Sequence, residues 1–269
     1  MFITTSAHWP PFLMFSASKM ASERLMNCRF KRPNAHVRLI CLPWGGGGSI
    51  FYAGWGRLMS ENIEVVGVTL PGRESRIDEK CCDDLEKIIT DIMDTIKSRY
   101  MDKPFILFGH SMGSLLAYEL ACRLKSQTGQ EPMKMYLSGI SAPHSPTRQR
   151  LNIDHNATDQ QFIEALGSLG GTPKEVLENE EIMKLILPTL RSDNTMLDKF
   201  HFTPSDGPPP FTCPISFFDG KDDAKHDTEA WRRLTTGLFT LTMMPGGHFY
   251  LHDPSNMRNI INHINRDFA

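Results

Sequence analysis

The stretch that decides the fold is Phe105-Ile106-Leu107-Phe108-Gly109-His110-Ser111-Met112-Gly113. Its first four residues are apolar, as in a buried strand, and Met112–Lys125 then carries apolar residues at helical spacing. A Gly-x-Ser-x-Gly pattern alone is weak, but between a strand and a helix it is typical of a nucleophile elbow. Glycines at 109 and 113 let strand and helix pack closely around a strained turn. The pattern predicts that Ser111 is a nucleophile; the alternative is an ordinary turn that happens to hold a serine.

Short apolar runs bounded by glycine, proline or charged residues recur on both sides of this elbow. Such runs are typical of a mostly parallel sheet that is covered on both faces. The predicted strands are Val37–Leu42, Val65–Leu70, Phe105–Phe108, Met135–Ser138, Ile215–Phe218 and Phe239–Met243. Helical patterns, such as the one that begins at Leu85, lie between them. The alternation predicts an α/β fold with right-handed crossovers and helices on both faces of the sheet.

One region, from about Asp159 to Phe200, has helical patterns but no strand. The turn Gly170-Gly171-Thr172-Pro173 divides it into two parts, and the proline-rich segment Thr203–Pro214 leads back to the sheet. An all-helical insertion late in such a sheet can form a cap over the site. Ordinary peripheral helices are the alternative reading.

Composition narrows the class of protein. The 269 residues are 40% hydrophobic and 22% charged, with a net charge of −2, which is ordinary for a globular α/β domain. The charge balance gives no reason to expect nucleic acid or an acidic membrane as a partner. No run approaches about 18 continuous apolar residues, so no membrane span is predicted.

The cysteines and the N-terminal residues indicate in which cellular compartment the protein is expected. Six cysteines form no CxxC or Cys/His metal pattern, which favours free thiols in a reducing compartment, the cytoplasm. Pro10 and Pro11 interrupt the apolar N-terminal stretch, which is therefore a poor secretory signal. We predict that residues 1–27 are a disordered extension.

A serine nucleophile needs a base, and ten histidines are present. His248 follows the last predicted strand in the glycine-rich segment Pro245–Leu251, which can bring an imidazole to the serine. His110 lies inside the elbow and cannot easily reach its neighbour's hydroxyl. His252 and His263 fall on or near the terminal helix and are expected in solvent. We predict His248 as the general base.

The acid that orients this base should follow the strand Ile215–Phe218. The chain continues there as Asp219-Gly220-Lys221-Asp222-Asp223, which would put Asp223 at the carboxyl edge of the sheet. Its role would be to hold the imidazole in the right tautomer and to stabilise its charged form. Asp222 and Asp227 stay open as alternatives.

An oxyanion needs backbone donors. One should be the N–H of Met112, the residue after the nucleophile, and the other should come from the loop after an early strand. Pro43-Trp44-Gly45-Gly46-Gly47-Gly48-Ser49 is such a loop, and its glycines let amides face a site. A glycine-rich loop can instead cradle phosphate. However, no complete Gly-x-Gly-x-x-Gly pattern and no Lys-Ser/Thr pair follows, so nucleotide binding is not expected.

Six motifs together resemble the type II thioesterases that serve fatty acid, polyketide and nonribosomal peptide synthases, the animal medium-chain fatty acid synthase members above all. The resemblance extends over about residues 28–265. The motifs are Leu42-Pro-Trp-Gly-Gly-Gly-Gly-Ser49, Leu70-Pro-Gly-Arg-Glu-Ser-Arg76, Phe108-Gly-His-Ser-Met-Gly-Ser114, Leu169-Gly-Gly-Thr-Pro173, Glu229-Ala-Trp231 and Pro245-Gly-Gly-His-Phe-Tyr-Leu251.

This resemblance implies an α/β-hydrolase fold over residues 28–269, with a mobile helical lid at about 159–200. It implies Ser111 as nucleophile, His248 as base and Asp223, in the Gly-x-x-Asp position, as acid. The second oxyanion amide falls at Gly45, where many relatives carry alanine or methionine. No cofactor or metal is implied.

The implied reaction is hydrolysis of medium- to long-chain fatty acyl thioesters, which releases free fatty acids. The implied partner is the acyl carrier domain of fatty acid synthase, which carries the acyl group on phosphopantetheine. Arg73 and Arg76 belong to a matching motif, and we expect them to form structural ion pairs. Two other functions stay open: a general carboxylesterase or lipase with the same triad, and a hydrolase-like protein that only binds.

Overall fold

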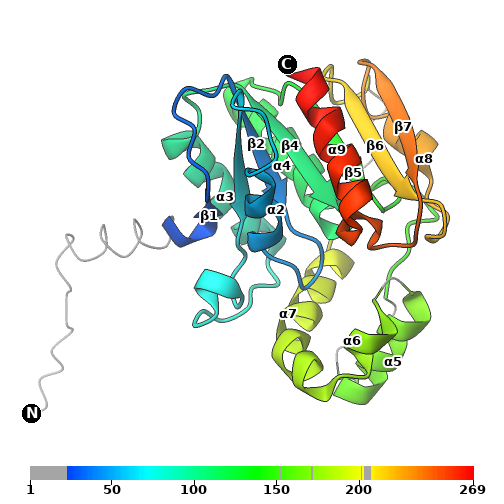
Figure 1. Cartoon of the computed structure of the whole chain (residues 1–269). Helices are drawn as coiled ribbons and strands as arrows, with labels where there is room; N and C mark the ends of the chain where they lie inside the picture. Colours follow the sequence, from blue (N-terminus) through cyan, green and yellow to red (C-terminus); the bar gives the residue numbers. More distant parts are fainter. Residues whose placement is uncertain (1–22, 152, 155, 171, 201, 203–206) are drawn as a thin grey trace, which may run out of the picture.

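In a computed structural model the chain forms one sheet flanked by helices (Figure 1). The structure describes residues 23–269, except 152, 155, 171, 201 and 203–206. Residues 1–22 of the predicted extension and Gly171 of the predicted turn therefore lie outside the described residues. No helix in the described part of the chain is long and apolar enough to cross a membrane.

The described residues form a sheet of seven strands in the order β1-β3-β2-β4-β5-β6-β7. Every neighbouring pair is parallel except β1 and β3, which are antiparallel. The strands are β1 (Met26–Asn27), β2 (Val37–Leu42), β3 (Ile63–Val68), β4 (Phe105–His110), β5 (Met135–Ser138), β6 (Ile215–Gly220) and β7 (Phe239–Met244). All six predicted strands are confirmed, and the predicted Val65–Leu70 is shifted because Ile63 and Glu64 pair with Val37 and Arg38.

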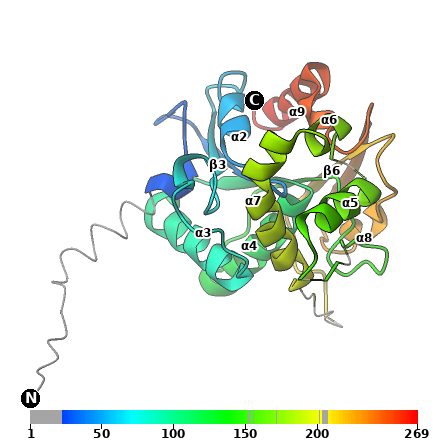
Figure 2. The same cartoon turned by 90° about the horizontal axis from the view of Figure 1, so that it is seen from below.

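Helices cover both faces of this sheet, as the alternating pattern predicts (Figures 1 and 2). One apolar core, which includes Ile40, Leu107 and Trp231, lies on the face of α3, α4 and α8. The other core, which includes Leu39, Trp55 and Ile260, lies on the face of α2 and α9. These helices are α2 (Ile50–Trp55), α3 (Leu85–Arg99), α4 (Met112–Thr128), α8 (Thr228–Arg232) and α9 (Pro254–Asp267), with short 3₁₀ turns at η1 (Glu74–Arg76) and η2 (Tyr250–His252).

The region predicted to lack strands is an insertion between β5 and β6, where the described residues form three helices. They are α5 (Asp159–Leu169), α6 (Lys174–Leu177) and α7 (Glu180–Asp198). Figure 1 shows them gathered below the end of the sheet, and Figure 2 shows them from that side. Leu151, Phe162, Met183 and Leu187 form a small buried core of their own within this region.

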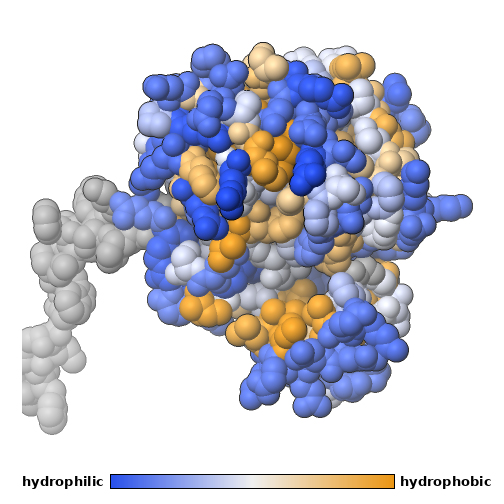
Figure 3. All heavy atoms as spheres, in the orientation of Figure 1, coloured by the Kyte–Doolittle hydropathy of each residue, from blue (hydrophilic) through white to orange (hydrophobic). Residues whose placement is uncertain are grey.

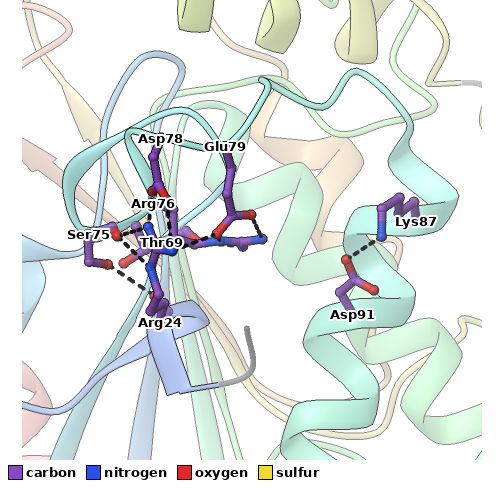
Figure 4. A network of polar contacts seen from close by, with 8 residues as sticks. All are labelled: Arg24, Thr69, Ser75, Arg76, Asp78, Glu79, Lys87 and Asp91. Carbon is purple, nitrogen blue, oxygen red and sulfur yellow. Dashed lines mark hydrogen bonds and ion pairs between the residues drawn. The ribbon is translucent and has the colours of Figure 1, made fainter. Parts of the chain in front are cut away.

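The folded chain begins before the predicted boundary at residue 28. Met26 and Asn27 pair with Val68 and Gly67. Figure 4 shows Arg24 reaching the loop after β3, where its Nε donates to the carbonyl of Ser75 at 2.7 Å and its guanidinium also pairs with Asp78. A two-residue strand leaves no periodic pattern in a sequence, so the prediction missed it.

Arg76 lies in the same network (Figure 4). Its guanidinium pairs with Glu79 at 2.6 Å and donates to the carbonyl of Thr69 at 3.0 Å. The prediction that this arginine forms a structural ion pair is therefore confirmed. All six cysteines are free thiols, and Cys41 and Cys213 are buried.

Substitutions at two glycines can test how tightly helix α2 packs on strand β3. A Cβ on Gly67 would lie 2.7 Å from the carbonyl oxygen of Ser49, whereas a Cβ on Gly54 would have no atom within 4 Å. We expect Gly67→Ala to lower the free energy of unfolding by about 1–3 kcal/mol through overpacking. Gly54→Ala, within the last turn of α2, should raise the free energy of unfolding by about 0.5–1 kcal/mol, because alanine loses less conformational freedom in a helix. Urea denaturation of both variants checks this; equal stability of the two would contradict the packing described.

Candidate active site

The elbow predicted from the sequence is present between β4 and α4. Ser111 has φ 53° and ψ −121°, and Glu74 is the other described non-glycine residue with positive φ. Such a conformation costs of order 1–3 kcal/mol and persists only where the surroundings impose it. Here the Ser111 amide donates to the carbonyl of Ser138 at 2.8 Å, across to the neighbouring strand β5. The backbone thus holds the serine in a strained turn at the carboxyl end of β4.

Glycines make this turn sterically feasible. A Cβ on Gly109 would lie 2.1 Å from the carbonyl oxygen of Gly113, and a Cβ on Gly113 would lie 2.3 Å from that of Leu42. Both contacts are with backbone, which cannot move aside as a flexible side chain can. The two glycines therefore bring strand, helix and the end of β2 into direct contact around the serine.

His248 and Asp223 form a hydrogen-bonded pair next to this turn. The imidazole Nδ1 lies 2.8 Å from Asp223 Oδ2, and the side chains are 18% and 6% exposed. When Nδ1 donates to the carboxylate, Nε2 is left with the lone pair that a general base needs. The other carboxylate oxygen accepts from the amide of Ala224 at 2.7 Å, which fixes the acid. The pair has the arrangement of a base and its orienting acid.

Backbone packing explains why these two residues meet. A Cβ on Gly220 would lie 2.7 Å from the carbonyl oxygens of Gly246 and Gly247, so the turn after β6 lies directly on the loop after β7. The amide of Asp222 donates to the carbonyl of Gly246 at 3.0 Å. Asp222 itself is exposed to solvent. The adjacent Asp223 then points to His248.

The third candidate acid, Asp227, binds groups other than His248. Its Oδ1 accepts from the amide of Ala230 at 3.0 Å at the start of α8, and its Oδ2 accepts from the hydroxyl of Ser145 at 2.9 Å. Of the three carboxylates left open by the sequence, the structure brings Asp223 to the histidine.

Ser111, Asp223 and His248 line one cavity, and the helical insertion forms part of its wall. Leu169 at the end of α5 and Asn194 and Leu197 of α7 line it together with Leu115 and Ile140. Figure 3 shows hydrophobic residues gathered where the insertion faces the rest of the molecule. Residues at the end of α5 and on α7 therefore form part of the cavity wall, and the cap interpretation stays a prediction.

The two amides predicted for the oxyanion belong to segments that lie next to each other, the start of α4 and the loop after β2. The contact of Gly113 with Leu42 places the start of α4 against the residue that leads into the glycine-rich loop. Within that loop the amides of Gly46 and Gly47 are occupied, by Asp193 Oδ2 at 2.7 Å and the carbonyl of Trp44 at 2.9 Å. The Gly45 amide has no hydrogen-bond partner among the described residues, and it stays the prediction for the second donor.

Comparison with known proteins agrees with this geometry. Residues 37–268 match the family model described as "Thioesterase domain". The chain belongs to the thioesterase family. It is 38% identical over 250 residues to the medium-chain S-acyl fatty acid synthase thioesterase of Rattus norvegicus, covering 93% of this chain and 94% of that protein.

Solved structures place this thioesterase among type II enzymes with an α/β-hydrolase fold. The type II thioesterase BorB from the borrelidin biosynthetic cluster is 31% identical, with a TM-score of 0.77, over 91% of this chain and 98% of BorB. Human thioesterase 2 is 32% identical, with a TM-score of 0.67, over 86% of this chain and 95% of the human chain. The family and fold expected from the motifs are therefore confirmed.

Three histidines that the sequence analysis set aside, His110, His252 and His263, do not line the cavity that holds His248. His110 is fully buried, with Nδ1 2.7 Å from the hydroxyl of Ser138, and burial lowers its pKa well below the usual value. The ring of His252 lies 5.1 Å from that of Trp44. His263, expected in solvent, is instead partly buried, with its ring 5.3 Å from Phe218, because α9 packs its inner face on the sheet.

A second histidine–carboxylate pair was missed by the sequence analysis. His226 Nδ1 lies 2.9 Å from Asp219 Oδ1, both side chains are 6% exposed, and His226 lines the cavity. The spacing of seven residues across a turn gives no periodic signal that would have revealed the pair. Asp219, Asp223 and His226 are also the one described group with ligand atoms close enough, within 4.8 Å, to hold a metal. The carboxylates of Asp219 and Asp223 already have histidine partners, at 2.9 and 2.8 Å, so the group is accounted for without a metal.

Two arginines of the cavity wall were also missed. Arg148 is buried and donates to the carbonyl of Phe200 at 3.1 Å, and Arg150 donates to the carbonyl of Asp198 at 3.2 Å. Burial and the nearby charge of Arg150 lower the pKa of Arg148 to about 10. Both side chains thus secure the C-terminal end of α7, where cations interact favourably with the helix dipole.

The assignment of the acid can be tested with adjacent aspartates. We expect Asp223→Asn to lower kcat by about 10³- to 10⁴-fold, because an amide cannot hold the imidazole in the required tautomer. Asp222→Asn, a matched change at the exposed neighbour, should leave kcat unchanged. Steady-state hydrolysis of an acyl thioester measures both variants. A large loss in Asp222→Asn with normal activity in Asp223→Asn would reverse the assignment.

Proposed function

We propose that this thioesterase cleaves acyl thioesters with Ser111 as nucleophile, His248 as general base and Asp223 as the acid that orients the base. The observation that carries the proposal is the 2.8 Å His248–Asp223 pair in the same cavity as a serine with φ 53°. A nucleophile, a base and an orienting acid are the parts that acyl transfer through a covalent intermediate needs.

In the first half of the reaction, Ser111 Oγ attacks the thioester carbonyl carbon while His248 Nε2 takes the hydroxyl proton. The carbonyl oxygen becomes an oxyanion, which the amides of Met112 and Gly45 would stabilise. One such donor is worth about 3 kcal/mol of transition-state stabilisation. The intermediate then collapses with cleavage of the C–S bond, and His248 returns the proton to the sulfur. A thiol of pKa about 8.5 leaves far more readily than an amine, so the thioester suits this apparatus.

In the second half, His248 takes a proton from water, whose oxygen attacks the acyl-serine. Collapse of this intermediate releases the free acid, and the proton returns to Ser111 Oγ. Asp223 stabilises the imidazolium each time it forms. Each turnover thus consumes one water and yields one carboxylic acid and one thiol.

We propose medium- to long-chain fatty acyl groups as substrates, carried on phosphopantetheine by the acyl carrier domain of fatty acid synthase. Two facts support this: the similarity to thioesterases named for fatty acid synthase, and the apolar residues that the insertion contributes to the cavity wall. In this proposal α5, α6 and α7 act as a mobile lid over the acyl chain. The six free thiols fit a reducing compartment, and we propose the cytoplasm.

A general carboxylesterase or lipase would use the same triad, and a protein that only binds would not turn over. Rates on matched oxygen esters and thioesters separate the esterase from the proposed thioesterase. Labelling of Ser111 by a fluorophosphonate would exclude a protein that only binds, because the reagent needs an activated serine.

The central prediction concerns Ser111→Ala. With a chain-length series of acyl carrier substrates, the wild type should release free acids, with a preference for medium or long chains. Ser111→Ala should lose at least about 10⁴-fold in kcat, because no other group can form the acyl intermediate. Ser98→Ala, a matched change at an exposed position on α3, should behave as wild type. Substantial turnover by Ser111→Ala would place the nucleophile elsewhere.

A further inference from the structure

Asp193 links the helical insertion to the glycine-rich loop. It lies on α7, its side chain is 2% exposed, and its Oδ2 accepts from the amide of Gly46 at 2.7 Å. Its two oxygens also accept from the guanidinium of Arg73, at 2.7 and 2.8 Å. A carboxylate from the lid thus lies buried against the loop that supplies the proposed second oxyanion donor.

Arg73 binds the same loop from the other side. Its Nη1 donates to the carbonyl of Gly47 at 2.9 Å, and its side chain is 7% exposed. The ion pair therefore contacts two consecutive residues of the loop, Gly46 through an N–H and Gly47 through a carbonyl. The prediction that Arg73 forms a structural ion pair is confirmed. Its partner is Asp193, and the two side chains together bind the glycine-rich loop.

Apolar packing reinforces this link. Leu190 lies one turn before Asp193 on α7, and a Cβ on Gly46 would lie 2.7 Å from its Cδ2. Gly46 also has φ 75°, which a side chain would adopt only with strain. The loop is thus shaped to let α7 approach its backbone directly.

The end of the loop that runs into α2 is held by Glu74, the neighbour of Arg73. The carboxylate of Glu74 accepts from the amide of Ser49 at 2.8 Å and from that of Ile50 at 3.0 Å. These two bonds fix the end of the loop that runs into α2, and they involve no residue of the insertion. The end near Gly45 and Gly46 depends instead on Asp193.

We infer that Asp193 is a positioning residue that aligns the Gly45 amide with the oxyanion only while α7 is docked. This inference rests on the proposed function of the site. The Gly45 N–H belongs to the peptide between Trp44 and Gly45, whose carbonyl accepts from the amide of Gly47 at 2.9 Å. Asp193 holds the middle of this same turn through the amide of Gly46, so the bond to Gly46 and the turn together set the direction of the Gly45 N–H. Displacement of α7 removes the acceptor from Gly46 and the counter-charge from Arg73 together. Closure of the lid and stabilisation of the oxyanion are therefore one event.

The test uses Asp193→Asn in the full chain. Asparagine keeps the shape and one carbonyl oxygen, but it cannot bind both Gly46 and the guanidinium as the carboxylate does. We expect kcat for a medium-chain acyl thioester to fall about 10- to 100-fold, less than complete loss of an oxyanion donor, with KM little changed. The matched control is Asp83→Asn, which breaks an exposed 2.8 Å ion pair between Lys199, at the end of α7, and the rest of the molecule without touching the loop.

Two inhibitors of the same chain length distinguish a role of Asp193 in positioning the oxyanion donor from a general role in packing the cavity. An alkyl trifluoromethyl ketone is attacked by Ser111 and gives a tetrahedral adduct with an anionic oxygen, whereas the matching thioether has no carbonyl. In Asp193→Asn the inhibition constant of the ketone should rise in parallel with the loss of kcat, while the Kd of the thioether stays that of the wild type. Equal weakening of both ligands, or no change in either, would overturn the inference.

Arg73→Lys gives a second measurement if Asp193→Asn does not fold. Lysine keeps the charge but cannot bind Asp193 through two nitrogens and Gly47 at once, so it should show the same pattern to a smaller extent. Wild-type affinity for the ketone in a folded Arg73→Lys variant would count against the inference. A wild-type enzyme that neither hydrolyses thioesters nor binds the ketone would overturn the proposed function itself.

Discussion

The contact between backbones at Gly109, Gly113 and Leu42 is the constraint on which the rest of the site depends. Because no side chain separates them, β4, α4 and the end of β2 lie closer together than side chains would allow. This contact forces the chain through a positive φ at Ser111 and aims the start of α4 at the reaction centre. It also brings the glycine-rich loop beside the serine. The proposed nucleophile and the proposed oxyanion donors are thus positioned by one backbone contact.

The parallel sheet brings the other site residues together. Because parallel strands leave recognisable patterns, most of the fold and of the candidate site could be predicted from the sequence. Loops that follow parallel strands emerge at one edge, so Ser111 after β4, Asp223 after β6 and His248 after β7 converge without being near in sequence. Each of these three strands left an apolar run in the sequence, and the segment after each carried glycine near a reactive residue. The strand pattern and the types of reactive residue therefore both indicated Ser111, Asp223 and His248. The choice between Asp222 and Asp223 stayed open because adjacent residues of a turn differ only in side-chain direction, which the contact of Gly220 with the next loop decides.

What the sequence could not reveal are contacts that depend on packing between distant elements. Asp193 lies on an amphipathic helix, where a charged residue ordinarily faces solvent, and its partner Arg73 is 120 residues away. The His226–Asp219 pair and strand β1 escaped for related reasons: one spans an irregular turn and the other has two residues. A buried charge becomes visible only once the structure shows what neutralises it.

The two parts of the molecule differ in how firmly they are held, and the difference suits their tasks. The sheet is packed between two large apolar cores, whereas the insertion has four buried apolar residues of its own. Elements with few buried apolar contacts open at a lower free-energy cost than the core does. The strained serine therefore belongs to the part that resists motion. Under the proposed function, acyl chains of different size would contact the insertion, which opens at a lower free-energy cost. A polar link such as the Arg73–Asp193 pair is well suited to join them. Its hydrogen bonds require a defined geometry, so a displaced lid does not leave the oxyanion loop half aligned.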